Sequence, residues 1–299
     1  MRPVFRILAL ILFLPLVAEA ASLTQDVDFA NYDSPLFAQI VGRIKANIGP
    51  RLGQGPLKRE RYFMIPFAYQ DKGNHPEHSH SFISVIRVFA RDTKPKLTPD
   101  LPTQGEYNGW DFEAFTISWL PADFLENPNL CVFEGPGARL FATKNKCPIS
   151  PGKNFNLQET IGLAVGDKSA VAMWGPYEIA APGFDLGVKR KRLLDSGSIK
   201  YRADDRLYQK EKTAISCFHA MAGLDEIYPK GGLFGTGLKM WGFNGTARVL
   251  IEYEGKAHYK KLLLDPVDVK KDRFVFVYAP AKDGPIPYGS VKGAAAYHQ

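Results

Sequence analysis

Apolar residues recur at helical spacing in three stretches of the chain. Residues 36–48 (LFAQIVGRIKANI) predict an amphipathic helix. Residues 156–166 (NLQETIGLAVG) predict a short helix, because an asparagine can cap its start and a glutamate occupies the capping-box position three residues later. Residues 184–198 (FDLGVKRKRLLDSGS) predict a third helix that ends near Gly197.

A second pattern is a series of stretches rich in β-branched and aromatic residues, which predict strands. The predicted strands are residues 61–69, 79–91, 112–121, 169–179, 247–255 and 273–280. Pro66 marks an edge or a bulge in the first strand, because proline lacks the N–H that a sheet ladder uses. Helices and strands mix without regular βαβ alternation, which favours the α+β class. The last two strands follow a glycine-rich stretch, so we expect a small β-rich extension over residues 229–299.

The N-terminus has the pattern of a secretory signal peptide. A short basic start, an apolar run over residues 7–17 and an A-x-A cleavage signature predict that residues 1–20 are removed. The apolar run is shorter than the roughly 20 residues that a membrane-spanning helix needs. We therefore expect an exported protein, periplasmic or extracellular, with no membrane-spanning segment in the mature chain.

The positive charge of the chain is modest, at a formal +7, and mostly scattered. The one basic block, residues 188–194, predicts a solvated helix face and not a nucleic-acid patch. We expect a small-molecule, peptide or cell-envelope substrate and no nucleic acid. The glycine-rich residues 231–239 lack the G-K-[ST] ending of a phosphate loop, and we expect no cofactor.

The chain contains three cysteines, Cys131, Cys147 and Cys217. Export permits disulfides, and a Gly/Pro-rich turn can bring the first two together. Such a bridge would contribute about 3 kcal/mol by closing a short loop. Cys217 is then left over as a reactive thiol, as a cysteine that pairs between chains, or as a small core residue.

Cys217 lies where a helix can begin. Ser216 is a suitable N-cap, and at the next position the helix dipole and unsatisfied N–H groups favour a thiolate. Cys217 is therefore a candidate nucleophile. His219 is a poor base for it, because residues two apart point in different directions on a helix, and we expect His219 to pack or to hold the helix.

Residues 73–82 (GNHPEHSHSF) contain half of the histidines of the chain, His75, His78 and His80. On a strand, His78 and His80 share a face, and His80 lies on the more apolar side. A histidine at the head of a core strand suits a thiol–imidazole pair with Cys217. The alternative is a metal site made by the three histidines with Glu77, but that site gives the cysteine no role, and we expect no metal.

The order of these features resembles the circularly permuted papain-like families, which are the permuted NlpC-type and lecithin:retinol acyltransferase-like proteins. They place a strand histidine before a nucleophilic cysteine that opens a helix. The matching motif is residues 216–219 (SCFH), in which Ser216 replaces the usual asparagine. The resemblance spans roughly residues 60–225 and implies a papain-like core, an antiparallel sheet packed on helices, over residues 21–228.

The resemblance also implies an activity, that of a cysteine hydrolase or acyltransferase acting on an amide, ester or thioester. Cys217 would attack an acyl carbon, and His80 or His78 would take the thiol proton. A polar group on the next strand would orient the imidazole, and the candidates are Glu113, Thr116 and Ser118. Two other functions remain open: a non-catalytic envelope protein of the same fold that binds a ligand or partner, and a metal-binding protein that uses the histidine turn.

Overall fold

The computed structural model describes most of the chain between Ser34 and Val277. The described residues are 34–53, 57–75, 78–91, 93, 104–107, 110–127, 130, 132–133, 145–203, 213–222, 241–255 and 261–277. The predicted signal peptide and Cys131 lie outside these residues, so the cleavage site and the predicted Cys131–Cys147 bridge stay predictions.

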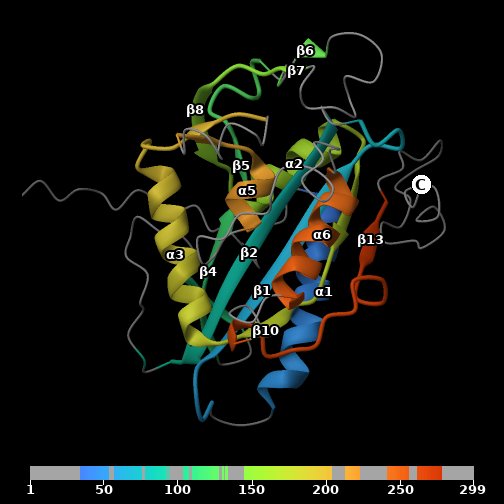
Figure 1. Ribbon diagram of the computed structural model, residues 1–299. Helices are drawn as coiled ribbons and strands as arrows, with labels where there is room; N and C mark the ends of the chain where they lie inside the picture. The colour runs from blue at the N-terminus through green and yellow to red at the C-terminus, as the bar shows by residue number, and fades with distance from the viewer. Residues whose placement is uncertain are drawn as a thin grey trace, which may run out of the picture.

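An antiparallel sheet of seven strands forms the centre of the molecule, in the order β13-β9-β1-β2-β4-β3, with β10 also paired to β1 (Figure 1). Its strands are β1 (Arg61–Gln70), β2 (Ser79–Ala90), β3 (Gln104–Tyr107), β4 (Trp110–Ile117), β9 (Ala170–Met173), β10 (Tyr177–Ile179) and β13 (Phe274–Phe276). With helices on this sheet, the predicted α+β class is confirmed.

A smaller sheet of four strands, in the order β12-β11-β8-β5, lies beside one end of the main sheet (Figure 1). Its strands are β5 (Trp119–Pro121), β8 (Ser150–Asn154), β11 (Lys200–Tyr201) and β12 (Ala214–Ile215), and β6 (Val132–Phe133) with β7 (Asn145–Lys146) forms a separate pair. The predicted strand 112–121 is divided at Ser118, where the chain leaves β4 and enters β5. Ser118 therefore lies at the junction of the two sheets.

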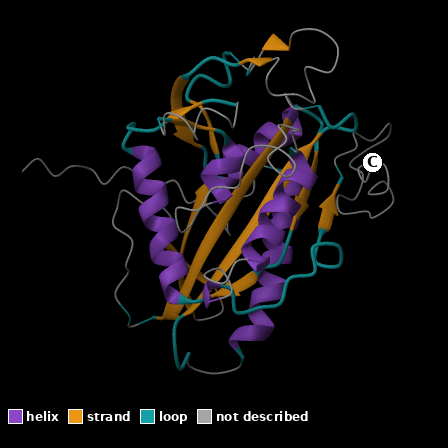
Figure 2. Cartoon of the chain, viewed as in Figure 1, coloured by secondary structure: helices purple, strands orange, loops and turns teal. Residues whose placement is uncertain are grey.

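Helices cover both faces of the main sheet (Figure 2). One face packs on α1 (Pro35–Leu52) and α2 (Leu157–Gly166), and the other packs on α3 (Ala181–Asp195), α5 (Cys217–Ala222) and α6 (Gly242–Gly255). The three helices predicted from apolar spacing are confirmed as α1, α2 and α3, and α2 begins with the predicted capping box of Asn156 and Glu159.

The alternation of side chains along β1 and β2 decides which helices each residue contacts. Phe67 and Phe82 pack in the core under α1 and α2, whereas Met64, Ile83 and Val85 pack in the core under α3, α5 and α6. Because both faces of the sheet are covered, nearly every residue of these two strands is buried, including the polar residues of β2.

Pro66 lies in a central strand and not at an edge, so the edge prediction was wrong. On one side, Pro66 pairs with Ile83 of β2. On the other side, β10 and β9 pair with residues 62–64 and 67–70 of β1, and Pro66 falls in the gap between them. Its carbonyl accepts the N–H of Trp174 at 3.0 Å, while its missing N–H faces the gap, where no ladder bond is lost.

The prediction of a strand at residues 247–255 was also wrong, because this stretch forms the second half of α6. Phe243, Leu250 and Tyr253 are buried at helical spacing, and this signal is stronger than the β-branched composition. The helix packs on β1 and β2, and β13 pairs with β9. The described part of residues 229–299 therefore belongs to the main sheet and its layers, and is not a separate β-rich extension.

Candidate functional site

Cys217 opens α5, as the sequence predicts. The Ser216 hydroxyl accepts the backbone N–H of His219 at 3.4 Å, which is an N-cap contact. Nδ1 of His219 also lies 3.4 Å from that hydroxyl, and the ring is fully buried. His219 therefore holds the start of the cysteine helix, as expected, and is not positioned as a base that a substrate could reach.

Cys217 is half-buried, and within the described residues it forms no disulfide. Its helix packs against β2, the strand that carries His80, and against β5, the strand that follows Ser118. The remaining described cysteine, Cys147, is buried next to the predicted bridge turn.

A buried chain of three polar side chains connects β2 to α2. Nε2 of His80 lies 2.9 Å from Oγ of Ser118, and Oγ1 of Thr160 lies 2.7 Å from the same Ser118 oxygen. Oγ1 of Thr160 also lies 2.7 Å from the backbone carbonyl oxygen of Asn156. His80, Ser118 and Thr160 are each at most 1% exposed. Of the predicted residues, His80 and Ser118 are therefore brought together.

The other two candidates for orienting the imidazole have different partners. Glu113 accepts a hydrogen bond from Arg87 at 3.0 Å, and Thr116 shares one with Ser84 at 2.7 Å. Both contacts lie further along β2 than His80, so neither side chain reaches the ring. Thr160 was missed by sequence reasoning, because a threonine inside a helix carries no local signal of a contact with a distant strand.

The imidazole of His80 lies among aromatic rings. It stacks on Phe82 with ring centroids 5.5 Å apart, and Tyr69 lies across the strand pair at 5.4 Å. Among the described residues, Nδ1 of His80 has no hydrogen-bond partner. Burial lowers the pKa of His80 to about 3. The ring is thus neutral at physiological pH, where burial makes it a weak base and it supplies no positive charge.

The predicted hydrogen bond between Cys217 and His80 is not formed. Nε2 of His80 bonds to Ser118, and Nδ1 has no partner among the described residues. Strand alternation gives the reason, because His80 points to the same face as Phe82, towards α2. The buried residues of α5, in contrast, pack with Ile83 and Val85 on the opposite face.

Tyr69 contacts the His80 ring, and its pKa responds to the charge of Cys217. Burial, followed by the charges of Asp167 and Cys217, raises the pKa of Tyr69 well above its usual range. Since the Tyr69 ring also lies beside His80, the thiol and the imidazole are near the same phenol. They therefore lie at the same end of the sheet although they do not touch.

His78, the alternative base, lies apart from this chain. Its side chain is about half-exposed, and Nδ1 is 3.7 Å from Oδ1 of Asp167, just past the end of α2. His75 pairs with Asp71 in the preceding turn. Across the described ranges, no group of three or more His, Cys, Asp or Glu side chains is placed to hold a metal ion, and Glu77 lies outside those ranges.

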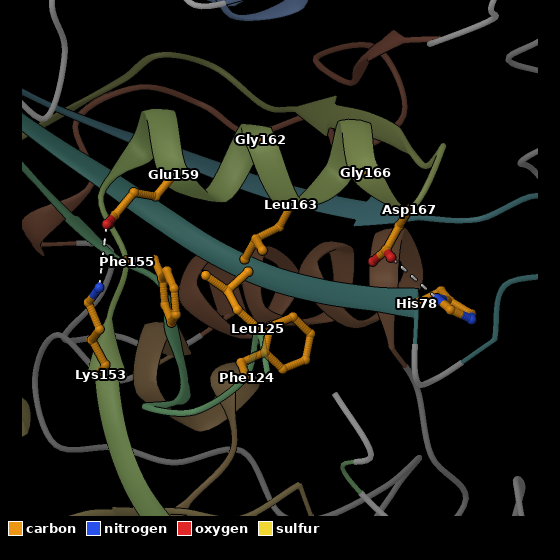
Figure 3. A pocket seen from close by; sticks show the side chains of 10 residues that line it. All are labelled: His78, Phe124, Leu125, Lys153, Phe155, Glu159, Gly162, Leu163, Gly166 and Asp167. Carbon is orange, nitrogen blue, oxygen red and sulfur yellow. Dashed lines mark hydrogen bonds and ion pairs between the residues drawn. The ribbon is translucent and has the colours of Figure 1, made fainter. Parts of the chain in front are cut away.

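A groove of about 600 Å³ runs along the outer side of α2 (Figure 3). Apolar side chains face one another in its middle, and ion pairs stand at its two ends, Lys153 with Glu159 and His78 with Asp167. The lining residues are His78, Phe124, Leu125, Lys153, Phe155, Glu159, Gly162, Leu163, Gly166 and Asp167. This volume and apolar lining are typical of a small-molecule site.

On the sheet side, the first residues of β2 are also tied to α6. The hydroxyl of Thr246 donates to Oγ of Ser81 at 2.9 Å, on the face opposite His80. Consecutive residues at the head of β2 are thus hydrogen-bonded to elements on both faces of the sheet.

No family model, curated protein or solved structure matches the chain. The fold and the site by themselves define an α+β protein with a buried, oriented imidazole, a half-buried thiol nearby and an apolar groove. In the part of the chain that the structure describes, no helix has the length and apolar character needed to cross a membrane.

Proposed function

We propose that this protein is an exported cysteine hydrolase or acyltransferase with a papain-like core, in which Cys217 is the nucleophile and His80 is the base. The observation that carries the proposal is that the two ring nitrogens of His80 have different surroundings. Nε2 is held by Ser118, Nδ1 has no partner among the described residues, and the helix that Cys217 opens packs against β2, the strand that carries His80. A base needs this combination of an orienting contact and an available nitrogen.

The chemistry uses only side chains of the chain. Nδ1 of His80 takes the thiol proton while Sγ of Cys217 attacks the acyl carbon. The tetrahedral intermediate collapses, and the protonated ring gives its proton to the leaving amine, alcohol or thiol. Water, or a second acceptor, then attacks the thioester on Cys217, and His80 serves again as base.

Ser118 is not the nucleophile in this proposal, although its hydroxyl touches the imidazole. Ser118 is completely buried and has Thr160 on its other side, so no acyl carbon can approach it. Cys217, in contrast, is only half-buried.

The reaction requires Sγ of Cys217 to come within hydrogen-bond reach of Nδ1 of His80. The edge of β2 offers a route, because the pairing with β4 ends at Ile83 and residues 79–82 continue beyond it. The proposal requires the thiol on one face of the sheet to meet the imidazole on the other face around this edge. Catalytic contacts commonly tighten when substrate binds.

The test is the acylation of Cys217 by p-nitrophenyl acetate, followed by intact-protein mass spectrometry. We expect a single acetyl group on Cys217 in the unaltered protein, and an acylation rate lower by about 100-fold or more in His80→Asn, since general-base assistance has this magnitude. His78→Asn is the matched control and should leave the rate unchanged. Equal rates in the unaltered protein and His80→Asn would contradict the proposal.

A second function, ligand binding without catalysis, is favoured by the absence of a Cys217–His80 hydrogen bond together with the groove along α2. In that case the ligand occupies the apolar middle of the groove. Cys217→Ala would then leave both ligand binding and the biological role of the protein intact, whereas under the first proposal it abolishes turnover.

A further inference from the structure

The floor of the groove along α2 is bare helix backbone. Gly162 and Gly166 lie one turn apart on the same side of the helix, and both line the groove (Figure 3). No atom lies within 4 Å of the position that a Cβ would take at either glycine. Glycine is less favourable than alanine inside a helix. The missing side chains therefore leave a strip of open space beside α2.

Apolar side chains line the middle of this space. Phe124 and Phe155 are buried, whereas Leu125 is 68% exposed, and Leu163 points from α2 towards Leu125 (Figure 3). Between the two ends of the groove, none of the lining residues carries a charge. The gain from covering such a surface is roughly proportional to the apolar area removed from water. The middle of the groove therefore suits an apolar ligand.

The charged side chains stand at the two ends and already have partners. Nζ of Lys153 lies 3.4 Å from Oε1 of Glu159, whose other oxygen accepts the backbone N–H of Asn156 at 2.7 Å. At the far end, Nδ1 of His78 lies 3.7 Å from Oδ1 of Asp167, and burial raises the pKa of Asp167. A charged ligand would compete with the first pair, or add charge where burial already disfavours it.

The two ion pairs also limit the length of the space between them. Glu159 lies in the first turn of α2 and Asp167 is the C-cap, so a rise of about 1.5 Å per residue separates them by about 12 Å along the helix. The hydrocarbon layer of one membrane leaflet is thicker, at about 15 Å. A chain held between the pairs is therefore shorter than the tail of a membrane lipid, which favours a small free molecule.

We propose that the groove binds an uncharged, unbranched aliphatic molecule of the alkanol type, lying along α2 between the two ion pairs. This inference names the ligand class of the second function and rests on the groove as its binding site. It does not depend on catalysis by Cys217, because binding in the groove involves no reaction at the thiol.

The first experiment measures how the length of the chain affects affinity. The n-alkanols from butanol to decanol displace the fluorescent probe N-phenyl-1-naphthylamine from the unaltered protein. We expect the affinity to rise about fourfold for each added methylene, which is the value for a fully buried CH₂. The rise should stop once the chain exceeds about 12 Å, the separation of the ion pairs along α2. No displacement by any alkanol would overturn the proposal.

The second experiment varies the charge of the head group at constant chain length. At pH 7, octanol should bind about threefold or more tightly than octanoate or octylamine, because each ion loses hydration without gaining a free partner. Glu159→Gln can keep the capping contact but leaves Lys153 without its counter-charge, so octanoate should gain about twofold to fivefold in affinity. Lys153→Gln is the matched variant and should favour octylamine to a similar degree.

The outcomes separate this inference from the proposed functions. Tighter binding of either ion to the unaltered protein would overturn the uncharged ligand class, yet leave the groove as a binding site. Displacement by phosphatidylcholine vesicles and by none of the free alkanols would also overturn it, since the chain would then come from a membrane lipid. Cys217→Ala should bind octanol as the unaltered protein does, so a failure of catalysis does not affect this test.

Discussion

Nε2 of His80 and Oγ of Ser118 lie 2.9 Å apart at the point where the chain leaves the main sheet for the smaller one. The imidazole is fully buried, and burial keeps it in its neutral form. The neutral form has a measurable consequence for stability, because the same ring is exposed to water and protonates easily in the unfolded chain.

Lowering the pH should destabilise the protein more steeply than it destabilises a variant that lacks His80. Its pKa is about 3 in the folded protein and about 6.5 when unfolded, so between these values the unfolded state binds the extra proton. The stabilisation from the neutral ring is complete above pH 6.5 and decreases by about 1.4 kcal/mol for each pH unit below it. Urea unfolding at pH 7 and pH 5 should show a fall about 2 kcal/mol larger than in His80→Gln. The same change at His78, which is half-exposed, should alter the fall little, and equal falls in all three proteins would show that His80 is not buried in the neutral form.

Arg87 and Glu113 form a buried ion pair between β2 and β4, 3.0 Å apart and each at most 1% exposed. Glu60 also pairs with Arg87. Glu113→Ala should lower the free energy of unfolding by about 3–5 kcal/mol, because it leaves buried positive charge poorly compensated. The double variant Arg87→Met/Glu113→Leu should be less destabilised than the sum of its two single variants. Simple additivity in urea unfolding would contradict this prediction. The exposed Lys153–Glu159 pair is the control, and its loss should cost less than about 1 kcal/mol.

The groove should be closed by a side chain at Gly162. No atom lies within 4 Å of the position that a Cβ would take there, so a larger residue fits without distorting α2. Gly162→Ala should stabilise the protein by about 0.5–1 kcal/mol, because glycine is a poor residue inside a helix. Gly162→Leu should weaken the binding of a fluorescent apolar probe by tenfold or more. Gly42 of α1 has the same open surroundings, and Gly42→Leu should leave probe binding unchanged. If both leucine variants bind the probe equally well, the probe does not occupy this groove.

Local features of the fold were predictable from the sequence. The cap of α2, the long strand β2 and the start of α5 at Cys217 each depend on neighbouring residues, and each is present. Residues 247–255 were misassigned because their β-branched and aromatic content was weighted above the helical spacing of their buried positions.

The arrangement of the site was only partly predictable. Strand alternation determines that His80 shares a face with Phe82, but the sequence does not show which helix will cover that face. The covering helix is α2 and not α5, and this choice separates the imidazole from Cys217. Which polar residue contacts the imidazole also depends on the register between distant strands. Arg87 pairs with Glu113, so Ser118 and not Glu113 is the partner of His80.

The head of β2 is hydrogen-bonded to two helices that lie on opposite faces of the sheet. His80 is bonded through Ser118 to α2, and the next residue, Ser81, is bonded to Thr246 of α6. A ligand that displaces α2 from the groove side would therefore strain the hydrogen bond between His80 and Ser118. Because Ser81 is the next residue, the same movement would also affect its hydrogen bond with Thr246 on the other face of β2. This strand therefore links the two helical layers through hydrogen bonds on both of its faces.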